Sequence, residues 1–492
     1  MSDGESLPGA VSLSDVWPSW VAGAPVTGEA TIEVRHPYDG RHVARVAVAD
    51  PATVERAVAA AVSVATEAAA LPAHVRADAL AHVSQRLAER TEEIAKVITA
   101  ENGKPLRWAR IEATRAASTF RWAAEEARRW SGDVQRLDTD PGAEGRLALV
   151  RRFPRGPVLG ISPFNFPLNL VAHKVAPALA VGAPIVVKPA PKTPLAALLL
   201  AEIVAETGLP GGMLSVVVVP NDRAPALTAD PRLPVVSFTG SGPVGHAIRE
   251  AVPHKHVTLE LGGNAAAVVC ADWSSDADLE RAASRIATFS NYQAGQSCIS
   301  VQRVLVDASV YDGFLDRLVA AVRSQRTGDP SDEQTDVGPL IDEDAARRVE
   351  TWVDEAVTSG ATLVTGGRRD GAAYEPTVLT DVPPGARVVC EEVFGPVLVV
   401  SRFDGVGAAF RTVNDSRFGL QAGIFTHDLE TAFRAHRDLD VGGVVVGDVP
   451  SYRADQMPYG GTKESGVGRE GVRFAMEDLT YERVLVLTGL DL

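Results

Sequence analysis

Hydrophobic residues recur at helical spacing through the first part of the chain. The first predicted helix has its apolar positions at Val54, Ala57, Val58, Ala61 and Val64. A second such pattern predicts a helix over residues 72–100, and Gly103 and Pro105 end it because glycine caps helices and proline interrupts them. A third, rich in alanine, arginine and glutamate, spans 106–130. Residues 1–30 lack either period and are expected to form a loose lead-in.

From residue 158 the pattern changes to short apolar runs separated by helical segments. Strands that alternate with helices form parallel sheets through right-handed crossovers, and such sheets bind ligands at the carboxyl ends of their strands. This part of the chain therefore predicts a nucleotide-binding α/β domain. Its expected strands are 158–161, 184–187, 215–219 and 235–238, and its expected helices are 168–181 and 194–207.

A second α/β series follows Gly263. Two alternating segments, 146–153 and 482–488, stand apart from both series and predict strands. The terminal one needs a partner along its exposed edge, which indicates pairing between subunits. Within the second series we expect strands over 265–269 and 301–306 and helices over 276–289, 310–326 and 343–359.

Composition narrows the class of protein. A chain of 492 residues is too long for one core, and 46% hydrophobic with 23% charged residues is typical of a globular protein. The net charge of −15 without a long basic run argues against nucleic acid or a membrane surface as partner. Cys270, Cys298 and Cys390 form no CxxC pair, so neither a disulfide framework nor a metal site is expected. No apolar run is long enough to span a bilayer, and we expect a cytoplasmic protein.

Two segments indicate covalent chemistry. Cys298 ends Ala294-Gly295-Gln296-Ser297-Cys298, where small neighbours allow a substrate carbon close to the thiol. Upstream, Glu260 precedes two glycines in Leu259-Glu260-Leu261-Gly262-Gly263. Taken alone, a single cysteine is more often a buried structural residue. Together, the two segments predict a thioester on the cysteine and a carboxylate that activates water.

Three further segments fit a bound cofactor and a developing oxyanion. The glycine-rich turn from Phe238 to Gly245 follows a strand and opens a helix, a pattern that favours phosphate, although such turns are also common without a ligand. Asn165 follows a strand and can donate to an oxyanion, or simply form a turn. Lys188 ends the next strand, where it can meet a ribose or lie on the surface.

At this point the chain resembles the NAD(P)-dependent aldehyde dehydrogenase superfamily. Seven segments occur in the family's order and span residues from about 150 to 470. They are PFNFPLN (163–169), VVKPA (186–190), FTGSGPVG (238–245), LELGGN (259–264), AGQSC (294–298), EEVFGPV (391–397) and PYGGTKESGVGRE (458–470).

The resemblance implies an α/β fold with a Rossmann-like cofactor domain, an α/β catalytic domain and a small β oligomerisation arm. It places the dinucleotide-binding domain at 18–132 and 152–262 and the catalytic domain at 263–463. The arm then comprises 133–151 and 464–492. A homo-oligomer, either a dimer or a tetramer, is expected.

The same resemblance implies roles for single residues. Cys298 attacks the aldehyde, Asn165 and the Cys298 backbone N–H hold the oxyanion, and Glu260 activates water to hydrolyse the thioester. Gly240, Ser241 and Gly245 belong to the pyrophosphate turn. Lys188 contacts the adenosine ribose, Glu392 the nicotinamide ribose, and Phe394 lies beside the ring.

Pro191 bears on the choice of cofactor. NAD-preferring members often have a glutamate at this position, three residues after the lysine, and its carboxylate binds the ribose hydroxyls. Its absence removes a repulsion toward a 2′-phosphate, and the adjacent Lys192 can attract one. We therefore expect the enzyme to use NADP, alone or together with NAD.

Motif details are most similar to the branch of lactaldehyde, phosphonoacetaldehyde and non-phosphorylating glyceraldehyde-3-phosphate dehydrogenases. In the anion-binding members of this branch arginines clamp the substrate, a role that suits a planar guanidinium, and Arg115 and Arg453 are the candidates for it here. Both can equally be structural ion-pair partners. Ser297 precedes the nucleophile where phosphate-using members tend to have arginine, which argues against a full phosphate clamp.

Two other readings remain. One is a coenzyme-A-acylating semialdehyde dehydrogenase, whose members commonly lack the glutamate that Glu260 represents. The other is a non-catalytic structural or binding relative. The joint presence of Cys298, Glu260, Asn165 and Lys188 favours an enzyme that releases the free acid.

Overall fold

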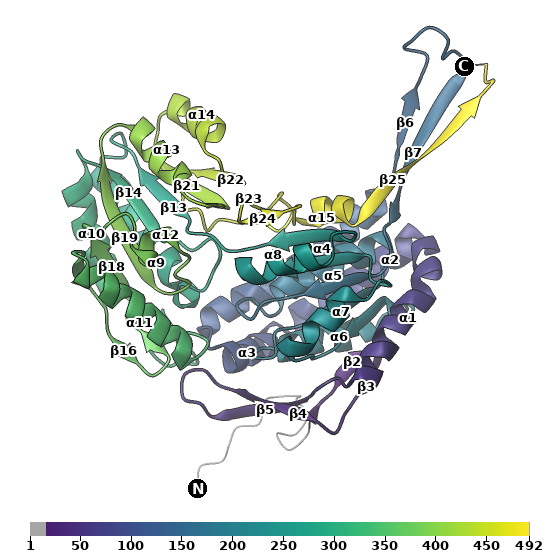
Figure 1. Ribbon diagram of the computed structural model, residues 1–492, viewed down its shortest axis with the longest axis horizontal. Helices are drawn as coiled ribbons and strands as arrows, with labels where there is room; N and C mark the ends of the chain where they lie inside the picture. The colour runs from purple at the N-terminus through teal and green to yellow at the C-terminus, as the bar shows by residue number, and fades with distance from the viewer. Residues whose placement is uncertain (1–15, 492) are drawn as a thin grey trace.

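Two large β-sheets form the two halves of the protein, and a narrow β-arm projects from one of them (Figure 1). The computed structural model describes residues 16–491. The α/β fold class expected from the sequence is confirmed.

The first large sheet has eight strands in the order β24-β12-β11-β8-β9-β10-β2-β3. Its five central strands run parallel, so their carboxyl ends meet at one edge, as predicted. Register brings Ile161 opposite Lys188 and Thr239 opposite Glu260 at that edge. The strands are β2 (Ser19–Val21), β3 (Ala24–Val26), β8 (Val158–Ile161), β9 (Ile185–Lys188), β10 (Leu214–Val216), β11 (Val235–Thr239), β12 (His256–Glu260) and β24 (Gly466–Val467).

Helices pack on this sheet and on one another. One of them, α5, has every one of its 13 residues buried. The set comprises α1 (Pro51–Ala70), α2 (Ala73–Glu89), α3 (Thr91–Asn102), α4 (Leu106–Arg129), α5 (Asn169–Val181), α6 (Leu195–Ala205), α7 (Ala224–Ala229), α8 (Gly242–Ala251) and α15 (Val472–Asp478).

The prediction of a single helix over residues 72–100 is wrong, because α2 and α3 are separate helices. Arg90 leaves helical geometry at the junction with φ −100° and ψ 17°. Its guanidinium there binds Glu93 at 2.8 Å and Glu202 at 2.9 Å. The periodicity of apolar positions continues across the break, which hides it in the sequence. Gly103 does end α3 as predicted, with φ 74°.

The loose lead-in expected over residues 1–30 is wrong for residues 16–26, while residues 1–15 lie outside the described part of the chain. Residues 16–26 form three short strands, of which β2 extends the first large sheet beside β10. Strands this short show no visible alternation. A small sheet in the order β1-β5-β4 covers one end and contains β1 (Val16–Trp17), β4 (Thr31–Arg35) and β5 (His42–Ala47).

The second large sheet has seven strands in the order β15-β18-β19-β14-β13-β21-β22. The strands are β13 (Ala266–Val269), β14 (Arg303–Asp307), β15 (Thr362–Thr365), β18 (Thr377–Thr380), β19 (Val397–Phe403), β21 (Gln421–Phe425) and β22 (Gly443–Val446). Its helices are α9 (Asp276–Asn291), α10 (Tyr311–Arg323), α11 (Glu343–Thr358), α12 (Arg387–Cys390), α13 (Val406–Asn414) and α14 (Leu429–Asp438). Two minor ladders pair β16 (Arg369–Asp370) with β17 (Ala373–Tyr374) and β20 (Phe418–Gly419) with β23 (Thr462–Lys463).

The projecting arm is a three-stranded antiparallel sheet in the order β25-β7-β6. Both strands expected here are present, as β7 (Arg146–Pro154) and β25 (Thr480–Thr488). The exposed strand β6 (Asp133–Arg136) was missed, because its polar sequence gives no alternating pattern. The division into domains at 18–132, 152–262, 263–463 and the two arm segments stays a prediction.

Hydropathy along the described residues identifies no single helix that is long and apolar enough to cross a bilayer. The pair α1 and α2 meets the criteria of length and composition only when the two are taken together, and it is bent by 117° at the break.

Candidate active site

The residues singled out by the sequence meet where the carboxyl edge of the first large sheet faces the start of the second. Asn165 follows β8, Lys188 ends β9 and Glu260 ends β12, so parallel register brings all three to one edge. Cys298 comes from the other side, in the loop before β14. Backbone geometry in this loop is unusual, since Gln293, Ala294 and Gly295 have φ values of 55°, 52° and 72°.

Cys298 lies in a small apolar cluster with Ile299, Leu420 and Tyr459. The Tyr459 hydroxyl is 3.0 Å from the Cys298 Sγ. Burial raises the pKa of the Cys298 thiol to about 12. A thiolate is the reactive form of cysteine, so donors near Sγ must oppose the effect of burial.

Asn165 is tied directly to the loop that precedes the cysteine. Its Nδ2 donates to the Gln296 carbonyl oxygen at 2.9 Å, two residues before Cys298. Its Oδ1 is buried without a protein partner. Asn102, the last residue of α3, holds both sides of this contact. Its Nδ2 donates to the Phe164 carbonyl oxygen at 2.8 Å, and its Oδ1 accepts from Gln293 Nε2 at 2.5 Å.

Glu260 is 3% exposed, and neither of its carboxylate oxygens has a protein hydrogen-bond partner. Its environment raises the pKa of the Glu260 carboxyl well above the usual range, first through burial and then through the neighbouring charge of Glu470. Gly460 borders this carboxylate closely, because a Cβ added there would lie 2.9 Å from Glu260 Oε1. The segment Tyr459-Gly460 therefore touches both the thiol and the carboxylate.

A buried ionic network backs this segment. Glu470 accepts from Lys174 at 3.2 Å and from Arg453 at 3.0 Å. Burial disfavours the ionised form of Glu470, but Lys174 and Arg453 outweigh it and lower the pKa of this carboxyl to about 2. The Arg453 guanidinium also lies 3.8 Å from the centre of the Tyr459 ring, and its Nε is buried without a partner.

Arg115, on α4, forms an ion pair with Asp455 at 2.8 Å. His173 from α5 shares the same carboxylate oxygen at 3.2 Å. Burial opposes ionisation of Asp455, but His173 and Arg115 outweigh it and hold the pKa of Asp455 well below its usual range. The ion pairs that were the alternative role for Arg115 and Arg453 are thus present in the structure. It does not conflict with anion binding, because both arginines lie on elements that border the site.

Lys188 lies at the end of β9 on this edge of the sheet. It is 3% exposed, and its Nζ donates to Asn221 Oδ1 at 2.9 Å. Burial lowers the pKa of Lys188 to about 8. Pro191 is half-buried in the loop after β9. The adjacent Lys192 is exposed and forms an ion pair with Asp342 at the start of α11.

The glycine-rich turn opens α8. Ser241 is its N-cap and makes no side-chain capping bond, and Pro243 occupies the first turn. A Cβ at Gly240 would approach the Phe238 ring to 2.6 Å, and one at Gly245 would approach Leu261 to 2.4 Å. Glycine therefore allows close packing at both positions, and the amino end of a helix is a type of site that favours a phosphate.

Glu392 and Phe394 border the junction between the two large sheets. Glu392 accepts from the Gly263 backbone N–H at 2.9 Å, and burial raises the pKa of its carboxyl to about 7. Phe394 has φ 49° and meets the Phe164 ring edge-on, with ring centres 5.9 Å apart. Phe164 in turn precedes Asn165, which connects this group to the oxyanion side.

The other residues considered in the sequence lie elsewhere. Cys270 is 6% exposed in the core of the second large sheet, and burial raises the pKa of its thiol to about 12. Cys390 is exposed at the end of α12. Within residues 16–491 no cluster of histidine, cysteine and carboxylate side chains is suited to a metal ion.

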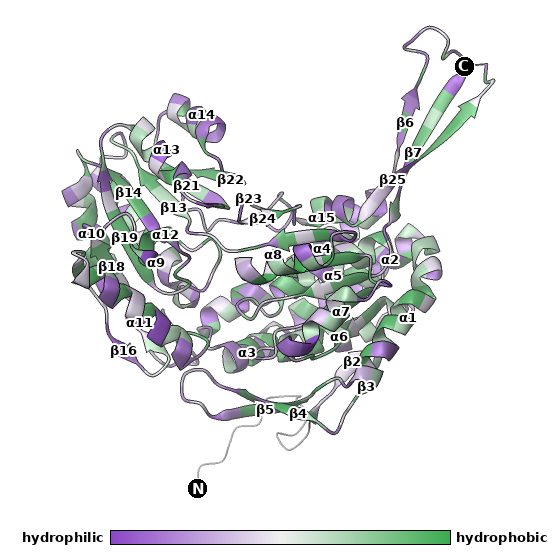
Figure 2. Cartoon of the chain, viewed as in Figure 1, coloured by the Kyte–Doolittle hydropathy of each residue, from purple (hydrophilic) through white to green (hydrophobic). Residues whose placement is uncertain are grey.

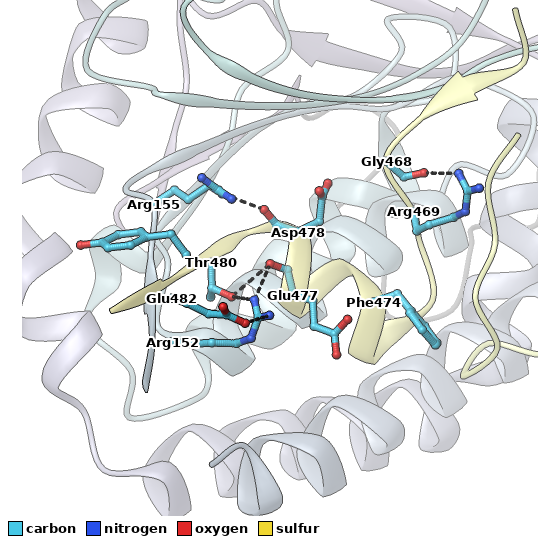
Figure 3. Close-up of a pocket in the computed structure, with 10 residues that line it drawn as sticks. Arg152, Arg155, Gly468, Arg469, Phe474, Glu477, Asp478, Thr480 and Glu482 are labelled. Carbon is cyan, nitrogen blue, oxygen red and sulfur yellow. Dashed lines mark hydrogen bonds and ion pairs between the residues drawn. The ribbon is translucent and has the colours of Figure 1, made fainter. Parts of the chain in front are cut away.

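A cavity of about 520 Å³ lies at the root of the arm (Figure 3). None of the predicted site residues lines it. Its charges are paired within the fold, as where Arg152 binds Glu482 at 2.6 Å and Arg155 donates to the Asp478 carbonyl oxygen at 3.0 Å. The lining comprises Arg152, Arg155, Gly468, Arg469, Phe474, Glu477, Asp478, Thr480, Tyr481 and Glu482.

Sequence reasoning missed the second layer of the site. Tyr459 and Glu470 are the second and last residues of the segment PYGGTKESGVGRE, so a signal was available. Two polar residues, His173 and Lys174, interrupt an otherwise apolar helix, which is also a readable anomaly. Asp455 carries no such signal, because a loop aspartate is unremarkable until its partners are known.

Comparison with known proteins identifies the same family as the sequence motifs. The aldehyde dehydrogenase family model matches residues 21–485. A 3-sulfolactaldehyde dehydrogenase of Priestia aryabhattai is 43% identical over 471 residues, which cover 95% of this chain and 97% of that protein. The predicted resemblance to the family is thereby confirmed.

Similar solved structures belong to the same family. The crystal structure of aldehyde dehydrogenase 21 from Physcomitrella patens, in complex with the reaction product succinate, has a TM-score of 0.94 at 43% identity and covers 96% of this chain and 98% of that one. NADP-dependent glyceraldehyde-3-phosphate dehydrogenase from Bacillus halodurans, complexed with NADP, has a TM-score of 0.92 at 34% identity over 96% and 100% of the two chains. This chain belongs to the aldehyde dehydrogenase family and is an NAD(P)-dependent oxidoreductase that acts on aldehydes.

Proposed function

We propose that the enzyme oxidises an aldehyde with a second, anionic group to the free acid, through a thioester on Cys298. The observation that supports this most directly is a group of buried polar atoms that have no protein partner among the described residues. They are Asn165 Oδ1, both oxygens of Glu260, His173 Nδ1 and Arg453 Nε. Buried polar atoms are normally paired, so such a gathering indicates a polar ligand.

In acylation, the Cys298 thiolate attacks the aldehyde carbon and forms a C–S bond. Negative charge then develops on the former carbonyl oxygen, where the Asn165 amide and the Cys298 backbone N–H are the donors. The short link from Asn165 to Gln296 keeps the two donors together. Lys188, the α8 turn and Glu392 would hold NAD(P)+, which would supply the hydride acceptor needed to oxidise the thiohemiacetal on Cys298 to a thioester.

In deacylation, Glu260 takes a proton from water as the water oxygen attacks the thioester carbon. The C–S bond then breaks, and the acid leaves while the Cys298 thiolate is regenerated. Only an ionised carboxylate can take this proton. The raised pKa of Glu260 makes it a stronger base once ionised, and its unpartnered oxygens leave room for water.

An anionic substrate fits the balance of charge around Tyr459. Three cationic side chains, Arg115, Arg453 and Lys174, face two ionised carboxylates there, Asp455 and Glu470. Burial lowers the pKa of His173 and raises that of Glu260, so it favours the neutral form of both. The remaining positive charge attracts a carboxylate, sulfonate or phosphate. Two similar proteins are named for a sulfonated substrate and a dicarboxylate product, which supports the same proposal.

For the cofactor, the same reasoning favours NADP. Pro191 has no carboxylate to repel a 2′-phosphate or to bind the ribose hydroxyls of NAD. Lys192 already pairs with Asp342, so its contribution requires that this exposed ion pair opens. A neighbour of known structure binds NADP.

The arm supports assembly into a dimer or a tetramer. On β25, Val484 and Leu485 are 56% exposed and Val486 is 47% exposed, so a hydrophobic edge faces solvent in one subunit (Figure 2). The end strand of the second large sheet, β22, is also unpaired on one side and has Val446 45% exposed. Exposed edges of this kind are normally covered by another chain.

The chemistry is tested with Cys298→Ser and Glu260→Gln. Cys298→Ser should lower kcat by orders of magnitude with cofactor binding retained, because an alcohol is a weaker nucleophile. Glu260→Gln should keep a first-turnover burst of reduced cofactor while steady turnover collapses. Cys390→Ser, at an exposed position at the end of α12, is the control. Near-normal turnover of Cys298→Ser would refute the mechanism, and a requirement for coenzyme A would favour the acylating alternative.

A further inference from the structure

Tyr459 packs directly against the nucleophile. Its hydroxyl is 3.0 Å from Cys298 Sγ, and its ring packs with Ile299 and Leu420 around the thiol. The residue is 3% exposed. Two backbone hydrogen bonds with Glu470, of 3.0 and 2.7 Å, fix its main chain. The hydroxyl is therefore held beside the sulfur.

Arg453 makes this phenol a better donor. Its guanidinium lies 3.8 Å from the centre of the Tyr459 ring and is fixed there by the Glu470 carboxylate. A cation over the ring face draws on the electron density of the ring, which strengthens the O–H as a donor. Burial raises the pKa of Tyr459 well above its ordinary value, so the phenol keeps its proton.

The other groups that face the thiol leave the thiolate poorly supported. Burial opposes its charge, as do the carboxyls of Glu392 and Glu260, whereas the Arg453 charge favours it. Arg453 acts across the tyrosine ring, whereas the Tyr459 hydroxyl touches the sulfur.

We infer that Tyr459 is a further catalytic residue, whose hydroxyl donates a hydrogen bond to the Cys298 thiolate and so supports acylation. When the thiolate attacks, the C–S bond forms, negative charge moves from sulfur to the carbonyl oxygen, and the phenol keeps its proton throughout. The opposite polarity, in which the phenol accepts from the thiol S–H, would stabilise the unreactive form. This inference rests on the proposed role of Cys298.

The test measures alkylation of Cys298 by iodoacetamide at pH 8 in the full-length enzyme, with the Cys298 peptide quantified by mass spectrometry. Far below the thiol pKa, the rate follows the thiolate fraction. Loss of a hydrogen bond to a charged group in Tyr459→Phe should slow alkylation roughly ten- to hundredfold. Tyr292→Phe is the matched control. It loses a hydroxyl that binds Ser297 Oγ at 2.8 Å, next to the nucleophile, and should alkylate at the wild-type rate.

A second replacement guards against a misfolded variant. Site-specific 3-fluorotyrosine at position 459 keeps the size of the side chain and makes the phenol a stronger donor, so alkylation should be faster than in wild type. An unchanged or faster rate in Tyr459→Phe, or a slower rate with 3-fluorotyrosine, would overturn the inference. Those outcomes leave the proposed function intact if Cys298→Ser is inactive, whereas an active Cys298→Ser would overturn both.

Discussion

At the scale of single residues, the environment of Glu260 explains why two carboxylates a short distance apart can have different roles. Glu470 is held ionised by Lys174 and Arg453. Glu260 lacks any such partner, and burial together with the Glu470 charge raises the pKa of its carboxyl well above the usual range. Pairs of titratable groups whose pKa values are pushed apart commonly divide acid–base tasks. Here the member that is held ionised is structural, and the member with the raised pKa belongs to the same site as the thiol.

This difference predicts the acidic limb of the pH profile. Because Glu260 must be ionised to act as a base, kcat should fall as pH falls through its raised pKa wherever deacylation limits the rate. Glu470→Gln removes the negative neighbour and should move this fall to lower pH. The measurement is kcat against pH, with Glu477→Gln at the end of α15 as control. A limb that stays in place would contradict the coupling between the two carboxyls.

A second prediction at this scale concerns Pro191. Pro191→Glu introduces a carboxylate near the adenosine ribose, which should repel a 2′-phosphate by about 1–4 kcal/mol depending on the local dielectric. Wild type should have kcat/KM with NADP equal to or above that with NAD, and the variant should shift toward NAD. Lys192→Ala separates the contribution of the lysine. If wild type prefers NAD a hundredfold, another part of the pocket decides the cofactor.

At the scale of elements, α3 joins the two loops that carry the reacting groups. Asn102→Ala removes a part-buried hydrogen bond to Phe164 and a buried one to Gln293, and should lower the free energy of unfolding by about 1–3 kcal/mol. Acylation should slow as well, because Asn165 and Cys298 lose their common support. Asn414→Ala also loses two hydrogen bonds, to Asp438 and Asp440, but both are exposed, at the end of α13. Equal burst rates in the two variants would show that Asn102 has a purely structural role.

The sequence predicted elements well where they are long or where parallel strands leave continuous apolar runs, as at β8 and β11. It failed at Arg90, where helical periodicity persists through a break, and at residues 16–26, where strands of two or three residues have no period. Of the site, the first layer was predictable from Cys298 and Glu260. The supporting layer was not, because contacts such as Lys174 with Glu470 join distant segments and depend on the fold.

At the scale of the whole molecule, the arm predicts the state of assembly. Light scattering at micromolar concentration should give a dimer or tetramer. Leu485→Asp should weaken assembly, since it places a charge on a hydrophobic edge that is 56% exposed in one subunit. Leu429→Asp, at a position 70% exposed on α14, is the control and should not. An active wild-type monomer would contradict the proposed role of the arm.

The burial of helix α5 determines how the site is lost when the protein unfolds. Helix α5, with all 13 residues buried, supplies His173 and Lys174 to the ionic network. Amides in such a helix exchange with solvent mainly when the whole domain opens, unlike those of loops and termini. The charges behind Tyr459 are therefore shielded from partial opening at the surface. As the protein is heated, catalytic competence and global structure should disappear over the same temperature interval, with no inactive, otherwise folded state between them.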